Sequence, residues 1–257
     1  MCSFMVYTKN DIEEKDFLEG FEKISYRGPD MARTDFTNGM WGFHRLAIMG
    51  LNEKGMQPFY FKGSRVVCNG EIYGFRTIKK SLENEGYKFN SDSDCEILLP
   101  LYEKYKEKMF EKLDAEFACV IYDVDLNDYI AARDPIGIRP LFYGYSKVSD
   151  SIMFASEAKA LVDLCNKVLP FPLGSYYKNG KFIKYYDATK YTRYNDEKLD
   201  VIAKNIHDKL EKAVLKRIDS DAPIGYLLSG GLDSSLVCAI AARHSDKPIK
   251  TFAIGMS

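Results

Sequence analysis

Apolar residues recur at two spacings along the first part of the chain. Runs with β-prone or alternating apolar residues predict strands at 2–7, 41–48, 66–68, 117–122 and 129–133. Helical spacing places Phe17, Phe21 and Ile24 on one face of a helix. A second helix is predicted to open at 156–161, with Cys165 on its apolar face. The pattern therefore predicts strands and helices interleaved over this part of the chain.

The last quarter of the chain has a different pattern. A polar stretch at 187–198 predicts a linker, and apolar residues from Ile202 to Val214 predict an amphipathic helix. The apolar run Ile224 to Leu228 predicts a buried strand, and a further strand is expected over Lys250 to Ile254. We therefore divide the chain into two domains, residues 1–190 and 191–257.

Between the predicted strand at 224–228 and a helix expected from near Ser234 lies the turn Ser229-Gly230-Gly231. Backbone N–H groups and the helix dipole at such a junction favour an anion. Glycines let the backbone approach a phosphate closely. No lysine follows, so the turn is not a Walker loop. An ordinary strand-to-helix turn is the alternative interpretation.

Composition and charge limit the partners of the chain. It has 257 residues, 46% hydrophobic and 28% charged, with a net charge of −1. These values are typical of a globular protein and give no reason to expect nucleic acid or membrane binding. The start, Met1 to Phe4, does not have the pattern of a signal peptide. Six dispersed cysteines without a C-x-x-C, and three histidines, argue against a metal site and for a cytoplasmic setting.

Cys2 is a candidate nucleophile. If Met1 is removed, Cys2 carries both a thiol and the free α-amine of the chain. Such an amine titrates near pH ~8 and a thiol near ~8.5, so the amine can act as base for its own side chain. No histidine is needed for this chemistry. A buried strand cysteine is the alternative interpretation.

The residues that follow Cys2 carry a resemblance. Several motifs occur in order along the chain: Tyr26-Arg27-Gly28-Pro29-Asp30, Arg45, Gly55-Met56-Gln57-Pro58, Asn69-Gly70-Glu71-Ile72-Tyr73 and Ser93-Asp94-Cys95-Glu96. Together with Cys2 they resemble the class II glutamine amidotransferase domain of glutamine-hydrolysing asparagine synthetases. The resemblance covers residues 1 to about 186. It implies an α+β fold, the four-layer αββα sandwich of N-terminal-nucleophile hydrolases.

The resemblance implies a role for each matched residue. Arg45 would hold the glutamine carboxylate through its guanidinium fork. Asp94 and the backbone at Gly70-Glu71 would hold the α-ammonium, and the Asn69 amide and Gly70 N–H would stabilise the oxyanion. The catalytic set is Cys2, Asn69 and Gly70, and the glutamine-binding set is Arg45, Leu46, Ala47, Ile48, Met49, Asn69, Gly70, Glu71 and Asp94.

Each of these residues also has an ordinary structural interpretation. Asn69-Gly70 alone favours a hairpin turn, and Arg45 on a strand favours a surface ion pair. Asp94 favours a helix N-cap. Some positions depart from the family pattern, among them Tyr26 in place of histidine, and Gly74. Pro100 lies within a helical pattern, where it is expected to kink or delay the helix.

The stretch Ser229 to Ser235, with Asp221 to Gly225 before it, resembles the pyrophosphate loop of asparagine synthetases, which are N-type ATP pyrophosphatases. The resemblance implies an incomplete α/β nucleotide-binding unit, because only one β-loop-α-β unit follows the linker. It implies ATP, with Mg²⁺ on the leaving pyrophosphate, whereas glutamine hydrolysis needs no cofactor. The implied ATP-binding residues are Leu228, Ser229, Gly230, Gly231, Asp233, Ser234 and Ile254.

The expected function is glutamine-dependent amide transfer of the asparagine synthetase type. Glutamine would yield glutamate and ammonia, and the ammonia would pass to an acceptor carboxylate adenylated by ATP. Aspartate is the default acceptor. A sugar acid, a peptide carboxylate or a deazapurine precursor is the alternative, and so is a non-catalytic glutamine-binding or regulatory subunit. A homodimer or a separate synthetase polypeptide is a candidate partner.

Overall fold

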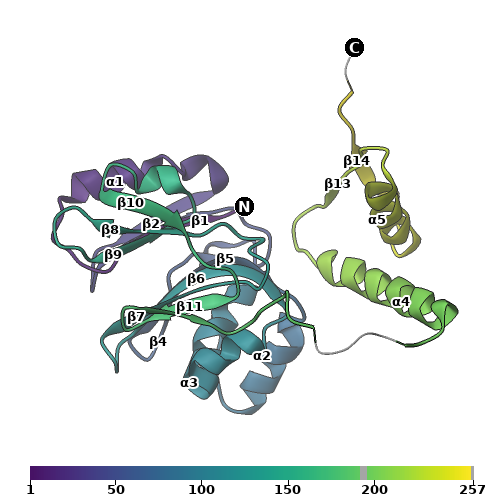
Figure 1. Ribbon diagram of the computed structural model, residues 1–257, viewed down its shortest axis with the longest axis horizontal. Coiled ribbons are helices and arrows are strands. Elements are labelled where there is room, and N and C mark those ends of the chain that lie inside the picture. Colours follow the sequence, from purple (N-terminus) through teal and green to yellow (C-terminus); the bar gives the residue numbers. More distant parts are fainter. Residues whose placement is uncertain (192–195, 256–257) are drawn as a thin grey trace. The chain divides into compact units, whose positions relative to one another are not determined.

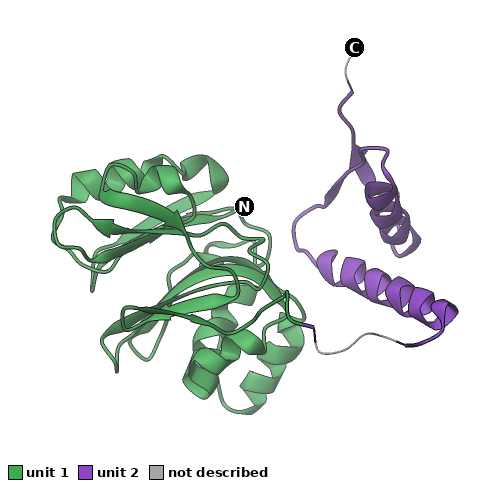
Figure 2. Ribbon diagram, viewed as in Figure 1, with its two compact units in different colours: residues 1–190 green, residues 191–257 purple. Residues whose placement is uncertain are grey.

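The computed structural model describes residues 1–191 and 196–255 (Figure 1). The chain forms two compact units, residues 1–190 and 191–257 (Figure 2). Part of the stretch 187–198, which the sequence predicts to be a linker, lies outside the described residues.

The first unit contains two six-stranded antiparallel sheets. One sheet has the order β10-β8-β9-β1-β3-β2, with β1 (Ser3–Tyr7), β2 (Met31–Asp35), β3 (Met40–Arg45), β8 (Phe142–Ser146), β9 (Ile152–Ala155) and β10 (Cys165–Pro170). The other has the order β12-β11-β7-β6-β5-β4, with β4 (Phe59–Phe61), β5 (Ser64–Ile72), β6 (Ala115–Asp123), β7 (Asp128–Arg133), β11 (Ser175–Lys178) and β12 (Lys181–Lys184).

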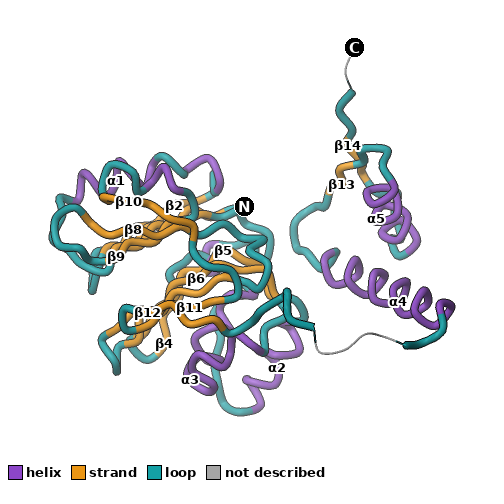
Figure 3. The backbone as a smooth tube through the Cα atoms, viewed as in Figure 1, coloured by secondary structure: helices purple, strands orange, loops and turns teal. Residues whose placement is uncertain are grey.

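Helices cover the outer face of each sheet (Figure 3). The α-helices of this unit are α1 (Glu14–Glu22), beside the first sheet, and α2 (Phe75–Asn84) and α3 (Leu98–Tyr105), beside the second. Short 3-10 helices are η1 (Ser25–Arg27), η2 (Glu53–Gly55), η3 (Asp94–Ile97), η4 (Lys106–Glu111) and η5 (Ala158–Ala160). One apolar core lies between the sheets and one lies under the helices of each side. The predicted α+β four-layer αββα sandwich is therefore confirmed.

Strand alternation decides which side chains meet between the sheets. In β1, Phe4 and Val6 pack between the sheets, whereas Met5 packs beneath α1. In β5, Val67 packs between the sheets, whereas Cys68 packs toward α2 and α3. Cys2 and Asn69 share the parity of the inward residues. The two strands contact each other across the sandwich, so both side chains are directed to the same interior.

The helix predicted from 156–161 with Cys165 on its face is wrong. Only one 3-10 turn, η5, forms, and Cys165 begins β10. The reason is that Ser156 is hydrogen-bonded to β1. The Phe4 amide donates to the Ser156 hydroxyl at 3.0 Å, and the Ser156 amide donates to the Phe4 carbonyl at 3.0 Å. Pro100 acts as expected, because η3 precedes α3 and the proline falls in the first turn of α3.

The second unit contains α4 (Leu199–Arg217), β13 (Gly225–Leu227), α5 (Leu232–Arg243) and β14 (Lys250–Phe252). The two strands pair in parallel, and α4 packs on α5 around Val214, Ile240 and Ala241. The expectation of a buried strand at 224–228 is wrong, because Leu227 is 80% exposed. With three-residue strands in a two-stranded sheet, the ladder is short, so β14 ends at Phe252, before Ile254. The helix begins at Leu232, slightly before Ser234.

Candidate active site

Cys2 lies half-buried immediately before β1. Its thiol lies between the two backbone polar groups of Leu46, accepting from the amide at 3.3 Å and donating to the carbonyl at 3.4 Å. Burial raises the pKa of the Cys2 thiol, and the hydrogen bond from Leu46 acts in the opposite direction. A thiol with a raised pKa needs a base to become a thiolate at neutral pH.

Asn69 lies within β5, on the side of the strand that faces the first sheet. Its side chain is 1% exposed, and its Nδ2 atom is buried without a hydrogen-bond partner among the described residues. Buried polar atoms without partners are rare and costly, so this donor indicates a ligand or transition state that would use it. The hairpin-turn interpretation of Asn69-Gly70 is wrong, because both residues lie inside β5.

Gly70 and Gln57 fix the backbone on either side of Asn69. A Cβ on Gly70 would lie 2.7 Å from the Glu116 carbonyl oxygen, so only glycine fits against β6. The Gln57 amide pairs with the Cys68 backbone, donating to its carbonyl at 3.0 Å and accepting from its N–H at 2.6 Å. The sequence motif included Gln57 without indicating this role. Its position just before a proline in an ordered set of motifs was the only available signal.

Arg45 ends β3 and is 3% exposed. Its guanidinium donates to the Asn52 carbonyl at 2.6 Å, to the Met49 carbonyl at 3.1 Å and to the Gly50 carbonyl. The loop that contains the predicted residues Leu46, Ala47, Ile48 and Met49 is thereby folded around the arginine. The surface ion-pair interpretation is wrong. Burial lowers the pKa of the Arg45 guanidinium, and the charge of an ionised Cys2 would act in the opposite direction.

Two carboxylates lie at the end of β5. Asp94 is 4% exposed, and its Oδ2 accepts from the Ile72 amide at 2.8 Å. The pKa of Glu71 is raised to about 8, chiefly by burial and next by the negative charge of Asp94. Burial also raises the pKa of Asp94. Asp94 begins η3, whose N-cap residue is Ser93, so the N-cap interpretation is wrong. Paired acids in a desolvated position are suited to a cation.

The 26–30 motif holds the start of the chain. The Arg27 Nε donates to the Cys2 carbonyl at 3.2 Å, and its Nη1 pairs with Glu157 at 2.8 Å. Asp30 accepts from the Ala47 amide at 2.8 Å. Burial, together with the charge of Arg27, lowers the pKa of the Met1 α-amine. Sequence reasoning missed Glu157, since nothing in its local pattern marks it.

The structure therefore brings together the predicted residues of the first unit. Cys2 lies against Leu46, and the charge of Glu71 acts on the Cys2 thiol and raises its pKa. Gly70 accepts a weak hydrogen bond from the Cys95 thiol at 3.9 Å, next to Asp94. Over the described residues, the site contains a thiol, an amide donor without a partner, an arginine and two acids. Thiols and buried amide donors are the kinds of group that an attack on an amide would use.

The predicted phosphate loop follows β13 in the second unit. Gly230 has a φ of +82°, which favours glycine, and space around it is open. The Ser229 and Ser234 hydroxyls lie 3.0 Å apart, and Gly231 is the N-cap of α5. Of the other predicted ATP-binding residues, Leu228 directly follows β13 and Asp233 lies in the first turn of α5. Ile254 lies beyond β14 and is fully exposed.

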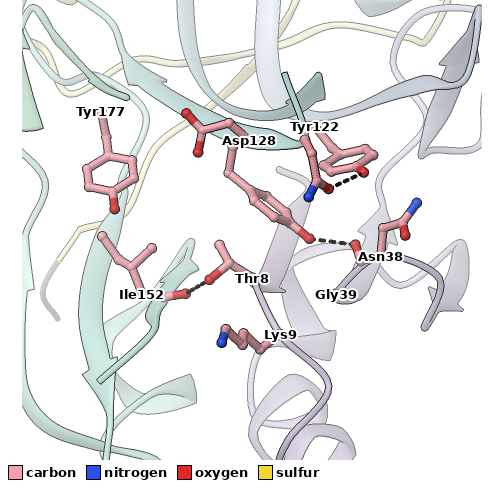
Figure 4. A pocket seen from close by; sticks show the side chains of 10 residues that line it. Thr8, Lys9, Asn38, Gly39, Tyr122, Asp128, Ile152 and Tyr177 are labelled. Carbon is pink, nitrogen blue, oxygen red and sulfur yellow. Dashed lines mark hydrogen bonds between the residues drawn. The ribbon is translucent and has the colours of Figure 1, made fainter. Parts of the chain in front are cut away.

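A separate hollow of about 300 Å³ opens between the sheets beyond the other end of β1 (Figure 4). It is lined by Thr8, Lys9, Asn38, Gly39, Tyr122, Asn127, Asp128, Tyr129, Ile152 and Tyr177. Thr8 lies six residues from Cys2 along an extended strand, which corresponds to roughly 20 Å. Tyr129 and Tyr122 direct their hydroxyls to Asn38 and Asn127. The hollow is thus distinct from the Cys2 site.

Over the described residues, no group of three His, Cys, Asp or Glu side chains is placed to hold a metal ion. In the same part of the chain, no helix is long and apolar enough to cross a membrane.

The four-layer sandwich has the architecture of the class II amidotransferases, which are N-terminal-nucleophile hydrolases. The chain belongs to the glutamine amidotransferase domain family, whose model matches residues 1–194. A second model, asparagine synthase, matches residues 205–257. The resemblance that the motifs indicated is confirmed.

Curated relatives extend over both parts. A probable glutamine-hydrolysing asparagine synthetase of Schizosaccharomyces pombe is 38% identical over 257 residues, which covers 96% of this chain and 46% of the relative. Asparagine synthetase 1 of Saccharomyces cerevisiae is 39% identical, with 96% and 44% covered. The chain thus spans about half the length of these relatives.

Among solved structures, glutamine phosphoribosylpyrophosphate amidotransferase of B. subtilis, complexed with ADP and GMP, matches with a TM-score of 0.59 at 18% identity. The match covers 98% of this chain and 65% of that one. At this identity the likeness shows the fold alone.

Proposed function

We propose that the first unit hydrolyses glutamine to glutamate and ammonia at Cys2. The observation that carries the proposal is the buried, unpartnered Nδ2 of Asn69 on the strand facing Cys2. A donor of this kind is suited to the oxyanion that forms when a thiolate attacks an amide. The asparagine synthetase relatives, named as glutamine-hydrolysing, support the same substrate.

In the proposed reaction, the N-terminal amine takes the proton of the Cys2 thiol, and Sγ attacks the side-chain amide carbon of glutamine. Asn69 Nδ2 and the Gly70 N–H stabilise the oxyanion. The C–N bond breaks, the amine returns the proton to the nitrogen, and ammonia leaves a γ-glutamyl thioester. Water then attacks the thioester, which releases glutamate and restores the thiol. Glutamine and water are consumed, and glutamate and ammonia are formed.

Binding of glutamine uses the two ends of the site. Arg45 is assigned to the α-carboxylate, and the loop Leu46 to Met49, which folds around it, forms one wall. Glu71 and Asp94 are assigned to the α-ammonium, which would offset the repulsion between the two carboxylates. The substrate thus completes the charge balance of the pocket.

The mechanism requires that Met1 be removed. In the chain as described, the free amine belongs to Met1, one residue before the thiol, and the Cys2 nitrogen is an amide. After removal, the amine and the thiol belong to the same residue. Burial and the Arg27 charge lower the pKa of the Met1 amine, which supports a neutral base at this position of the fold.

For the second unit, we propose a contribution to ATP binding in an asparagine synthetase type of reaction, with aspartate as the default acceptor. The open Gly230 and the start of α5 are suited to phosphates. Mg²⁺ would accompany the pyrophosphate, held mainly by phosphate oxygens, with Asp233 as the nearest acid of the loop. The six free cysteines support a reducing, cytoplasmic setting as part of the proposal. A homodimer or a separate synthetase polypeptide remains a candidate partner.

The test is glutamate release by the purified chain after its intact mass has shown loss of Met1. Cys2→Ala should abolish release, and a glutamine-mimicking electrophile should add to Cys2. Cys238→Ala, in the second unit, is the matched control and should retain the wild-type rate. Unchanged release by Cys2→Ala would contradict the mechanism. Absence of release in the processed wild type would favour a non-catalytic glutamine-binding subunit.

A further inference from the structure

The loop between β7 and β8 carries a buried arginine, Arg139, to which neither the motifs nor the proposed reaction gives a role. Its position is fixed from both sides. The carboxylate of Asp134 accepts from the amides of Ile138 and Arg139, each at 3.0 Å. The Arg133 guanidinium donates to the Arg139 carbonyl at 2.8 Å. The Arg139 side chain is therefore placed by a rigid loop, and the residue is 5% exposed.

The guanidinium of Arg139 is directed toward the acids of the active site. Its Nη2 pairs with Glu116 Oε1 at 2.8 Å, and both side chains are largely buried. Glu116 on β6 lies directly opposite Glu71 on β5 in the antiparallel register. Directly opposite residues in such a pair have their Cβ atoms about 5 Å apart. Arg139 Nε is buried without a hydrogen-bond partner among the described residues, so the cation is not fully used by Glu116.

The charges of several groups act on the pKa of Glu71. They are Asp94 on η3, Arg139 on the β7–β8 loop, Glu116 on β6 and the N-terminal amine. The thiols of Cys2 and Cys95 also lie within its electrostatic reach. Of the two cations in this set, Arg139 has the larger effect on the Glu71 pKa, so the ionisation of Glu71 depends on where that guanidinium lies. The Arg139 charge lowers the pKa of Glu71, and that of Glu116 raises it.

We propose that Arg139 is a positioning residue of the glutaminase site, which neutralises Glu116 and thereby lets Glu71 ionise when it receives the α-ammonium of glutamine. The inference rests on the proposed function. Arg139 contacts neither the reacting amide nor the thiol in this assignment. Arg139 acts through Glu116 on β6 and Glu71 on β5, and the loop between β7 and β8 keeps its guanidinium buried beside Glu116.

Opposite effects are expected for the two members of the pair. Arg139→Met should raise KM for glutamine roughly tenfold at neutral pH, because a nearby opposite charge typically shifts a carboxyl pKa by about one to three units. The difference in KM between Arg139→Met and the wild type should become smaller as the pH rises past about 8, where Glu71 of the wild type ionises. Glu116→Gln should lower KM for glutamine at pH values below about 8. Arg139→Lys, which keeps the charge, should retain most of the wild-type pH profile.

The double variant Arg139→Met/Glu116→Gln removes both charges and leaves no unpaired ion, so it should return KM toward the wild-type value. It also serves if Arg139→Met alone fails to fold. If Arg139 has a purely structural role, Arg139→Met and Glu116→Gln should both raise KM. In that case the acidic limb of the pH profile of kcat/KM should stay where it is in the wild type. That outcome would overturn the proposal.

A second readout does not depend on activity. The carboxyl carbon of Glu71 can be titrated by ¹³C NMR in the wild type and variants, with its signal assigned by Glu71→Gln. We expect the Glu71 pKa to rise in Arg139→Met and to fall in Glu116→Gln. If the wild type releases no glutamate but the titrations shift as stated, the proposed function fails and the charge relation stands. Unshifted titrations would overturn the relation itself.

Discussion

At the scale of single residues, Asn69 is the side chain whose environment is hardest to explain without a reaction. Among the described residues its buried Nδ2 has no partner, which costs stability, and in the proposed reaction it gains an interaction when the oxyanion forms. Asn69→Ala should therefore lower kcat by roughly 10²–10³ with little change in KM. Steady-state kinetics of glutamate release measure both constants. A change in KM alone would show that Asn69 only binds glutamine.

Arg45 has two duties that can be separated. Its guanidinium holds the carbonyls of the 49–52 loop, and its charge is assigned to the glutamine carboxylate. Arg45→Ala should chiefly raise KM, and it should also lower the free energy of unfolding by about 1–3 kcal/mol, because buried carbonyls lose a charged donor. Kinetics and chemical denaturation check the two parts. A raised KM with unchanged stability would show that the loop does not need the arginine.

Glu71 should make the fold less stable as the pH rises. Its pKa is about 8 in the folded chain against an ordinary 4.5, so the unfolded chain ionises this group first. The stability it contributes is complete below about pH 4.5 and is lost as the pH approaches 8. Glu71→Gln should therefore gain stability relative to the wild type across this interval. Denaturation at several pH values measures the difference, and a gap independent of pH would contradict the assignment.

Much of the site could be predicted, because its residues lie in short motifs with recognisable chemistry. Cys2, Asn69 and Asp94 belong to this group. Gln57, Glu157 and Arg139 act on the site through contacts with residues 11, 130 and 23 positions away in the sequence. No local pattern encodes such pairings. Their roles depend on how the strands register, which periodicity alone does not determine.

At the scale of elements, the strands were more predictable than the 3-10 turns. The sequence predicts a strand at β1 and at 66–68 within β5, and the structure shows which of their alternating side chains enter the sandwich. The segment that begins at Ser156 has helical spacing, but Ser156 continues the pairing of β9 with β1 through its hydrogen bonds with Phe4. Tertiary contacts thus override a weak local preference. In the second unit the sequence predicts the strand at 224–228 but not its exposure, because its apolar run resembles that of a central strand.

The pairing of β5 with β6 gives a prediction about Gly70. A Cβ there would lie 2.7 Å from the Glu116 carbonyl oxygen and 2.8 Å from Phe117 Cβ, so the strands would have to separate. Gly70→Ala should destabilise the fold by about 1–3 kcal/mol. Gly231→Ala is the matched control, because its Cβ would meet only the Ser229 hydroxyl, at 3.5 Å, and its φ is −76°. Equal unfolding midpoints for both variants would contradict the close packing.

At the scale of the whole molecule, the two units differ in how far their apolar residues are buried. The first has three apolar cores between four layers, and its site residues are buried. In the second, Leu227, Phe252 and Ile254 are 80%, 59% and 100% exposed. A two-stranded sheet covered by so little apolar packing is marginal in isolation. The asparagine synthetase relatives are about twice as long as this chain.

The last prediction concerns this polypeptide of 257 residues on its own. The loop Ser229 to Gly231 and the start of α5 can attract phosphate, so weak pyrophosphate binding is expected. Activation of a carboxylate also requires contacts to adenine and ribose, and Ile254, assigned to the adenine, is fully exposed. We therefore expect no exchange of labelled pyrophosphate into ATP, with or without aspartate, from a preparation that still hydrolyses glutamine. Aspartate-dependent exchange would show that these 257 residues suffice for adenylation. The view that the second unit cannot activate a carboxylate by itself would then have to be abandoned.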